Sequence, residues 1–127
     1  MAKIERFEVI EAWQKGRELS KAIYVITGQG GFARDFGLRD QMRRAAVSVM
    51  SNIAGGYDRG GNREFVQFLS IAEGCAVEVQ AQLYVALDAE YIDQEQFDSL
   101  YHLAADIGRL MADSSAICQT RIQGSKI

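Results

Sequence analysis

The segment NREFVQFLSIAEGCAVEVQAQLYVALDA, residues 62–89, decides the fold class. Apolar residues recur in it at alternating steps of three and four, the spacing that places side chains on one face of an α-helix. The chain contains no proline, so we expect one long helix here, with Asn62 capping the free amides of its first turn. The predicted seam of this helix comprises Phe65, Phe68, Ala72, Cys75, Val79, Gln82 and Ala86.

Three further segments, residues 5–27, 38–58 and 93–119, show the same helical period. Short links separate the four segments, and the last link offers Asp93 as an N-cap for the helix that follows. No segment alternates between apolar and polar residues in the manner of a strand. The sequence therefore predicts an all-α fold, an antiparallel up-down four-helix bundle that forms a single domain over residues 1–127.

Two glycine doublets, Gly55-Gly56 and Gly60-Gly61, stand near the join of the second and third helices. A phosphate-binding loop would need a preceding strand and a Lys-Ser or Lys-Thr pair at its end. Here a helix precedes the doublets and no such pair follows. We expect the first doublet to permit close helix packing and the second to form the turn into the third helix.

The 62–89 helix carries more apolar surface than one seam requires. The apolar residues off the seam are Val66, Leu69, Ile71, Ala76, Val77, Leu83, Tyr84 and Val85. A bundle helix normally keeps a polar outer face, so the second apolar stripe predicts a subunit interface, to which we assign Val66, Leu69, Val77 and Tyr84. The alternative is that crossing angles within one bundle absorb this stripe.

The net charge of −3 is unevenly distributed, because residues 39–63 sum to +3 and residues 90–113 to −5. Four arginines of the basic segment, Arg39, Arg43, Arg59 and Arg63, are candidates for contact with RNA or a protein partner. The alternative is that they pair with the acidic fourth helix, within or between subunits. Tyr57 is the only aromatic residue in this segment, which gives base stacking little support.

A second polar set comprises Arg44, Asn52 and Glu78. Asparagine within a helix needs a partner for its amide, so we expect Asn52 to bond a neighbouring backbone group or to bridge helices. Arg44 and Glu78 are predicted to form a bridge between the second and third helices. The alternative function of these three residues is a pocket for a small ligand or a reaction.

The sequence offers little for catalysis or metal binding. His102 is the only histidine, whereas a di-iron bundle needs paired Glu-x-x-His motifs. Cys75 and Cys118 lack metal-ligand spacing and are expected to be reduced thiols. We therefore expect no metal, no cofactor and no enzymatic activity.

The N-terminal residues MAKIERFEVIEAW carry charges throughout, unlike a secretory signal. No uncharged apolar run approaches the ~20 residues needed to span a bilayer. The expected location is the cytoplasm, without membrane contact.

Four stretches resemble the small four-helix-bundle proteins encoded within intervening sequences of bacterial 23S ribosomal RNA genes. They are FEVIEAWQKGRELSKAIYVIT (7–27), FGLRDQMRRAAVSVMSNIAGGYDR (36–59), REFVQFLSIAEGCAVEVQAQL (63–83) and AEYID (89–93). The most specific part is QMRRAAVS (41–48) with the following Asn52-Ile53-Ala54. The accessory variability protein of diversity-generating retroelements is similar to the same stretches.

The resemblance implies a homo-oligomeric ring, commonly a pentamer, with a non-catalytic scaffold or binding role. The chain departs from the family pattern in lacking a proline in the first link and an Ile-Pro pair, where Val49-Met50 stands. Gly55 replaces a common glutamate, and Gly74-Cys75 replaces a Gly-Ser pair. The retroelement protein is thought to contact nucleic acid and a reverse transcriptase through a basic body, whereas this chain is acidic overall.

Overall fold

A computed structural model describes the backbone of residues 7–59 and 62–124 and the side chains of residues 7–57 and 63–114. Four helices account for most of this part of the chain: α1 (Glu11–Thr27), α2 (Phe36–Arg59), α3 (Asn62–Asp88) and α4 (Gln94–Gly124). Two short 3-10 helices, η1 (Phe7–Val9) and η2 (Gly30–Arg34), precede α1 and α2. The described residues contain no strand, which confirms the all-α prediction.

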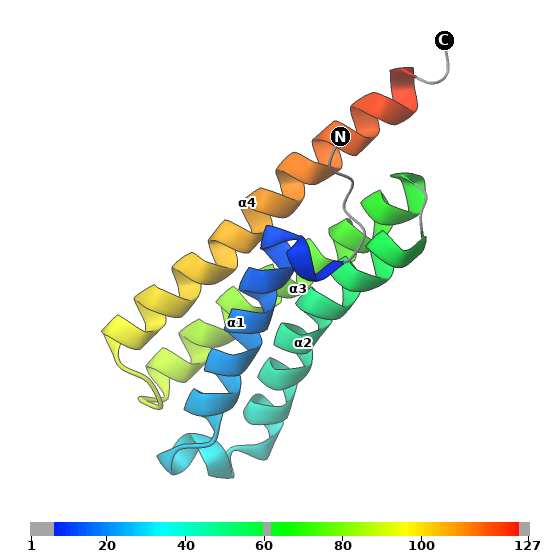
Figure 1. The fold of residues 1–127 in the computed structure, drawn as a ribbon. Coiled ribbons are helices and arrows are strands. Elements are labelled where there is room, and N and C mark those ends of the chain that lie inside the picture. Colours follow the sequence, from blue (N-terminus) through cyan, green and yellow to red (C-terminus); the bar gives the residue numbers. More distant parts are fainter. Residues whose placement is uncertain (1–6, 60–61, 125–127) are drawn as a thin grey trace.

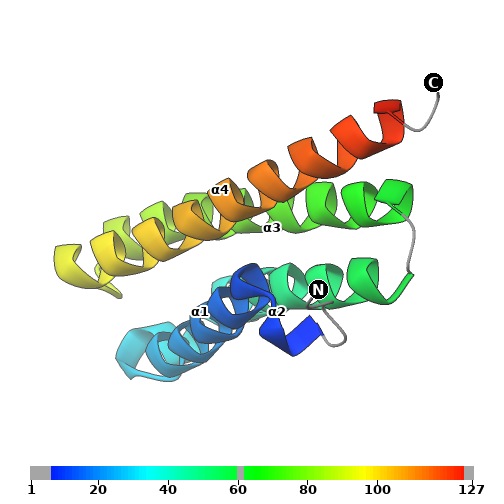
Figure 2. The same cartoon turned by 45° about the horizontal axis from the view of Figure 1, so that its top comes forward.

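The helices form two layers, with α1 beside α2 and α3 beside α4 (Figures 1 and 2). Each helix runs antiparallel to the next, as predicted for an up-down bundle. Helix α3 packs against both α2 and α4, and α1 packs against the same two helices, so α1 and α3 lie on a diagonal. None of the described helices therefore packs against the outer side of α3.

The predicted helix limits need correction at both ends of the chain. The first helix begins at Glu11 and not near residue 5, and the last reaches Gly124 and not residue 119. The link before α2 also has structure of its own, because the fully buried Phe32 anchors η2 in the core. Asp35 then caps α2 by accepting a 3.2 Å hydrogen bond from the Leu38 amide.

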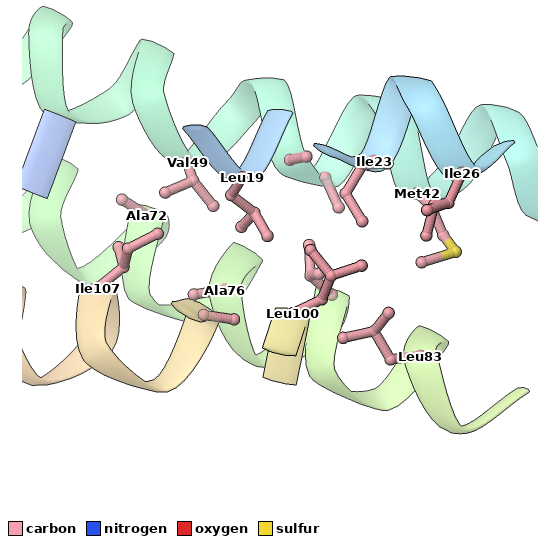
Figure 3. Packing of buried hydrophobic residues seen from close by; sticks show 14 of the residues in the cluster. Leu19, Ile23, Ile26, Met42, Val49, Ala72, Ala76, Leu83, Leu100 and Ile107 are labelled. Carbon is pink, nitrogen blue, oxygen red and sulfur yellow. The ribbon is translucent and has the colours of Figure 1, made fainter. Parts of the chain in front are cut away.

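All four helices contribute apolar side chains to one core (Figure 3). The predicted seam of α3 was displaced by one residue at three positions, where Leu69, Ala76 and Leu83 are buried in place of Phe68, Cys75 and Gln82. The buried residues of α3 are Leu69, Ala72, Ala76, Val79, Leu83 and Ala86. Only Ala72, Val79 and Ala86 belong to both sets, and the other predicted seam residues are half-buried at the edge of the core. Two adjacent apolar stripes satisfied the same period, and the sequence pattern alone did not distinguish them.

The close approach expected at the first glycine doublet is confirmed. A Cβ atom on Gly56 would lie 2.7 Å from the Cβ of Phe68, so α2 and α3 can meet here only because the side chain is absent. The predicted cap at Asp93 is also confirmed, since its carboxylate accepts a 2.8 Å bond from the Gln96 amide. The Gly60-Gly61 turn and the side chain of Asn62 lie outside the described residues.

Candidate interaction surfaces

The outer face of α3 is apolar and open to solvent. Val77 and Tyr84, both predicted interface residues, are 58% and 52% exposed. Ile71 and Val85 share this side of the helix and are 53% and 52% exposed. Helical spacing places these residues, with Gly74 and Ala81, opposite the buried seam of α3. We define the outer face of α3 as Ile71, Gly74, Val77, Ala81, Tyr84 and Val85, and the exposed polar residues Ser70 and Glu78 lie between them.

One of the predicted interface residues does not lie on this face. Leu69 is only 2% exposed and belongs to the core of the bundle, so its assignment to an interface was wrong. Val66 is half-buried near the start of α3, on the same side of the helix as Tyr84. Tyr84 lies on the face but leans toward α4, where its ring packs edge-on against Phe97 with centroids 4.8 Å apart.

The predicted partner-contacting arginines differ in how freely they are exposed. Arg39 is held by Asp40 at 2.9 Å and by the carbonyl of Ala33 at 3.0 Å. Arg63 is exposed at the start of α3. The side chain of Arg59 lies outside the described residues.

Arg43 joins α2 to α1. Its Nε donates a 2.8 Å hydrogen bond to Oγ1 of Thr27, and its guanidinium lies 4.5 Å from the centroid of the Tyr24 ring. Thr27 is fully buried and donates its own proton to the carbonyl of Ile23 at 2.6 Å. Tyr24 was not predicted as part of this site, because an aromatic residue on one helix and an arginine on another share no local pattern in the sequence.

A shallow groove follows the contact between α1 and α2. Its lining residues are Tyr24, Asp40, Arg43, Arg44, Val47 and Ser48. We call it the α1–α2 groove. Tyr24 is 48% exposed in it, and Arg44 is exposed as well.

The predicted polar set around Arg44 is not assembled. Among the described side chains, the ion pairs are Arg39–Asp40 and Arg109–Asp106, and no ion pair joins Arg44 to Glu78. Both residues are exposed, so hydration of each charge competes with a bridge. Asn52 instead donates a 2.8 Å bond to the carbonyl of Ser48, one turn earlier in its own helix, which confirms the local backbone partner expected for its amide.

A second groove lies between α1 and α4, and its charge is the opposite. Its charged residues are Glu18, Lys21, Asp93 and Glu95, and its apolar lining includes Ala22, Val25, Ile26 and Leu100. The acidic groups thus lie on the α4 side of α1, whereas Arg43 and Arg44 lie on its α2 side. The net acidity of the chain therefore does not describe the surface around the α1–α2 groove.

The remaining chemical groups form no recognisable reaction centre in the described part of the chain. His102 is exposed and meets only the edge of the Tyr101 ring, at 6.2 Å between centroids. Cys75 is half-buried, and burial raises the pKa of its thiol, an effect to which the charge of Glu78 adds. No three His, Cys, Asp or Glu side chains among the described residues are arranged to hold a metal ion.

No described helix is both long and apolar enough to cross a membrane.

Known proteins match the chain in family and in fold. The model of the 23S rRNA-intervening sequence protein family matches residues 8–113. A crystal structure of a protein of unknown function from the S23 ribosomal protein family of Bacteroides thetaiotaomicron superposes with a TM-score of 0.75 and 22% identity. That likeness covers 83% of this chain and 95% of the other, and it supports the fold alone. No curated protein matches the chain. The family match covers α1, α2 and α3 and most of α4, and the chain belongs to the 23S rRNA-intervening sequence protein family.

Proposed function

We propose that this protein is a non-catalytic, oligomeric scaffold of the cytoplasm that contacts RNA. In this proposal the subunits associate through the outer face of α3 into a closed ring, with five subunits as the family resemblance implies. Each subunit then presents its α1–α2 groove to RNA. Assembly and RNA contact are separate parts of the proposal, and each has its own experiment.

The observation that carries the proposal is the outer face of α3. Ile71, Val77 and Val85 are each more than half exposed on the side of the helix opposite the core. Burying apolar surface contributes about 25 cal/mol per Å², and a continuous apolar face on a small domain is typical of an association site. Glu78 is exposed beside these residues, so a neighbour that covers this face must pair its carboxylate or leave it in water at the rim of the contact.

The geometry of contact determines whether a ring forms. If the outer face of α3 met the same face of a second copy, the result would be a two-fold dimer. If it meets a different surface of the neighbour, repetition of that contact closes a ring. The solution mass distinguishes these arrangements, because a dimer is about twice and a pentamer about five times the 14.1 kDa of one chain.

RNA is the ligand that the charge distribution favours. The arginines gather on the α2 side of α1, away from the acidic groove beside α4. Repetition around a ring would concentrate a positive potential that one subunit shows only weakly.

Light scattering coupled to size-exclusion chromatography tests the assembly. We expect a mass near five chains for the wild type and near one chain for the double variant Val77→Glu/Val85→Glu. Val25→Glu is the matched control, because Val25 is equally exposed at 53% but lies on α1. A wild-type mass of 14.1 kDa, or an unchanged mass of the double variant, would overturn the scaffold model.

Binding of a labelled, structured RNA across a salt series tests the second part. Affinity should fall as salt rises, because arginine–phosphate contacts release counterions. If no binding is measurable even at low salt, the RNA proposal is rejected and a protein partner remains for the scaffold.

A further inference from the structure

We propose that the α1–α2 groove binds an unpaired nucleotide of RNA, with the base stacked on Tyr24 and the phosphate held by Arg44. This inference rests on the proposed RNA contact and specifies which form of RNA is recognised and by which side chains. It goes beyond a general arginine patch, because it gives the groove an aromatic platform supplied by α1.

The ring of Tyr24 is open to a second flat partner. The Arg43 guanidinium lies over the ring at 4.5 Å from its centroid, yet Tyr24 remains 48% exposed. A base could stack on the accessible part of the Tyr24 ring. The Arg43 guanidinium, the Tyr24 ring and the base would then form one stack of planar groups. Proteins recognise single-stranded RNA by such stacking on aromatic and arginine planes.

The platform is fixed before any ligand arrives. Thr27 is fully buried, and its hydroxyl both accepts from Arg43 at 2.8 Å and donates to the carbonyl of Ile23 at 2.6 Å. This chain of bonds holds the Arg43 guanidinium against Tyr24. Because the Arg43 side chain is already ordered, it loses little rotamer entropy when a ligand binds, and this favours affinity.

Arg44 is the cation available for a phosphate. It lines the same groove as Tyr24, and none of the ion pairs among the described side chains includes it. The carboxylate of Asp40, which also lines the groove, is already bonded to Arg39 at 2.9 Å. Ser48 follows Arg44 by one helical turn and lines the same groove, so the groove offers a guanidinium and a hydroxyl as phosphate donors.

An unpaired nucleotide fits this arrangement better than a duplex does. Bases within a duplex are stacked on one another and offer no free face to Tyr24. A purely structural explanation is that the hydrogen bond between Arg43 and Thr27 serves only to join α1 and α2. That explanation leaves the half-exposed ring of Tyr24 and the unpaired Arg44 without a role.

The test measures binding of a short, fluorescein-labelled oligoadenylate and of a labelled, blunt-ended RNA duplex by anisotropy. The variants are Tyr24→Leu, which removes the ring, and Tyr24→Phe, which keeps it. Arg44→Gln removes the proposed phosphate contact. Arg109→Gln on α4 makes the same change of charge at an exposed site outside the groove.

We expect Tyr24→Leu to weaken oligoadenylate binding at least about fivefold, the lower end of the effect of losing one stacked base. Tyr24→Phe should bind within about twofold of the wild type, because a phenyl ring stacks as well. Arg44→Gln should reduce the slope of log affinity against log salt by about 0.7, the value for one phosphate contact on a single strand. Arg109→Gln should leave that slope unchanged.

Failure of this inference can be distinguished from failure of the proposed function. If the wild type binds neither RNA, the RNA contact is rejected and the nucleotide site with it. If it binds the duplex as tightly as the single strand, or if Tyr24→Leu binds like the wild type, RNA contact stands and the nucleotide site is overturned. Circular dichroism and light scattering must show that each variant keeps the helical content and mass of the wild type.

Discussion

The hydroxyl of Tyr91 donates a 3.0 Å hydrogen bond to Oδ2 of Asp35 and joins the two inter-helix connections at one end of the bundle. The ring of Tyr91 also stacks on the buried Phe32, with centroids 4.9 Å apart. Oδ1 of Asp35 meanwhile caps the start of α2. The link between α1 and α2 and the link between α3 and α4 therefore form one packed unit.

This contact predicts an alkaline limit to stability. The hydrogen bond to Asp35 raises the pKa of Tyr91 above its ordinary value of 10.0, and burial raises it further. The pKa of Tyr91 is therefore higher in the folded state than in the unfolded state. The stability that the Tyr91–Asp35 bond contributes is fully present below pH 10 and is lost as pH rises through the folded-state pKa. Tyr91→Phe should lower the melting temperature at neutral pH, and the gap to the wild type should shrink above pH 10.

The control for this pH effect is Tyr101→Phe, because the ring of Tyr101 stacks on Phe97 within the bundle. This substitution removes a hydroxyl without touching the bond between Tyr91 and Asp35. Melting curves at closely spaced pH values provide the comparison. A gap between wild type and Tyr91→Phe that stays constant past pH 10 would contradict the assigned role of the Asp35 bond.

Gly56→Ala should destabilise the bundle. A new Cβ would lie 2.7 Å from the Cβ of Phe68, an atom fixed to the backbone of α3, so the helices must move apart. Such overpacking typically costs about 1–3 kcal/mol, which exceeds the ~1 kcal/mol that alanine gains over glycine in a helix. Gly108→Ala is the matched control and should stabilise, because its Cβ meets no atom within 4 Å. Urea denaturation measures both, and a stabilised Gly56→Ala would show that α2 and α3 can separate freely.

Leu69→Ala tests the corrected assignment of the α3 faces. Leu69 is 2% exposed, so its truncation should cost about 2–5 kcal/mol of unfolding free energy through a cavity in the core. Val25→Ala, at an exposed position of α1, should change the unfolding free energy by no more than about 0.5 kcal/mol. If Leu69→Ala left the unfolding free energy unchanged but lowered the solution mass, Leu69 would be an interface residue after all.

The fold could be predicted because helical period and short links act locally. Asp93 was recognised as a cap from its position alone, and its bond to the Gln96 amide confirms it. The buried face of α3 was not recognised, because Leu69 and Phe68 are adjacent in sequence and belong to stripes of equal period. Only packing against α2 and α4 distinguishes the two, and that depends on the arrangement of the whole bundle.

The candidate surfaces were predicted less completely for a related reason. The arginines of α2 could be noted from their number, but their partners could not. Arg39 finds Asp40 beside it, whereas Arg43 finds Tyr24 and Thr27 on α1. Contacts across helices depend on register and rotation, which no local pattern encodes.

Thr27→Val tests whether the buried hydroxyl positions Arg43. Valine has nearly the same shape but neither accepts from Arg43 nor donates to Ile23, so we expect a loss of about 1–2 kcal/mol in unfolding free energy. Thr27→Ser keeps both hydrogen bonds and should lose less. In a double-mutant cycle with Arg43→Gln, the two losses should not add, because each substitution removes the same hydrogen bond. Strict additivity would mean that Thr27 and Arg43 stabilise the contact between α1 and α2 separately, and that Thr27 does not hold the guanidinium in place.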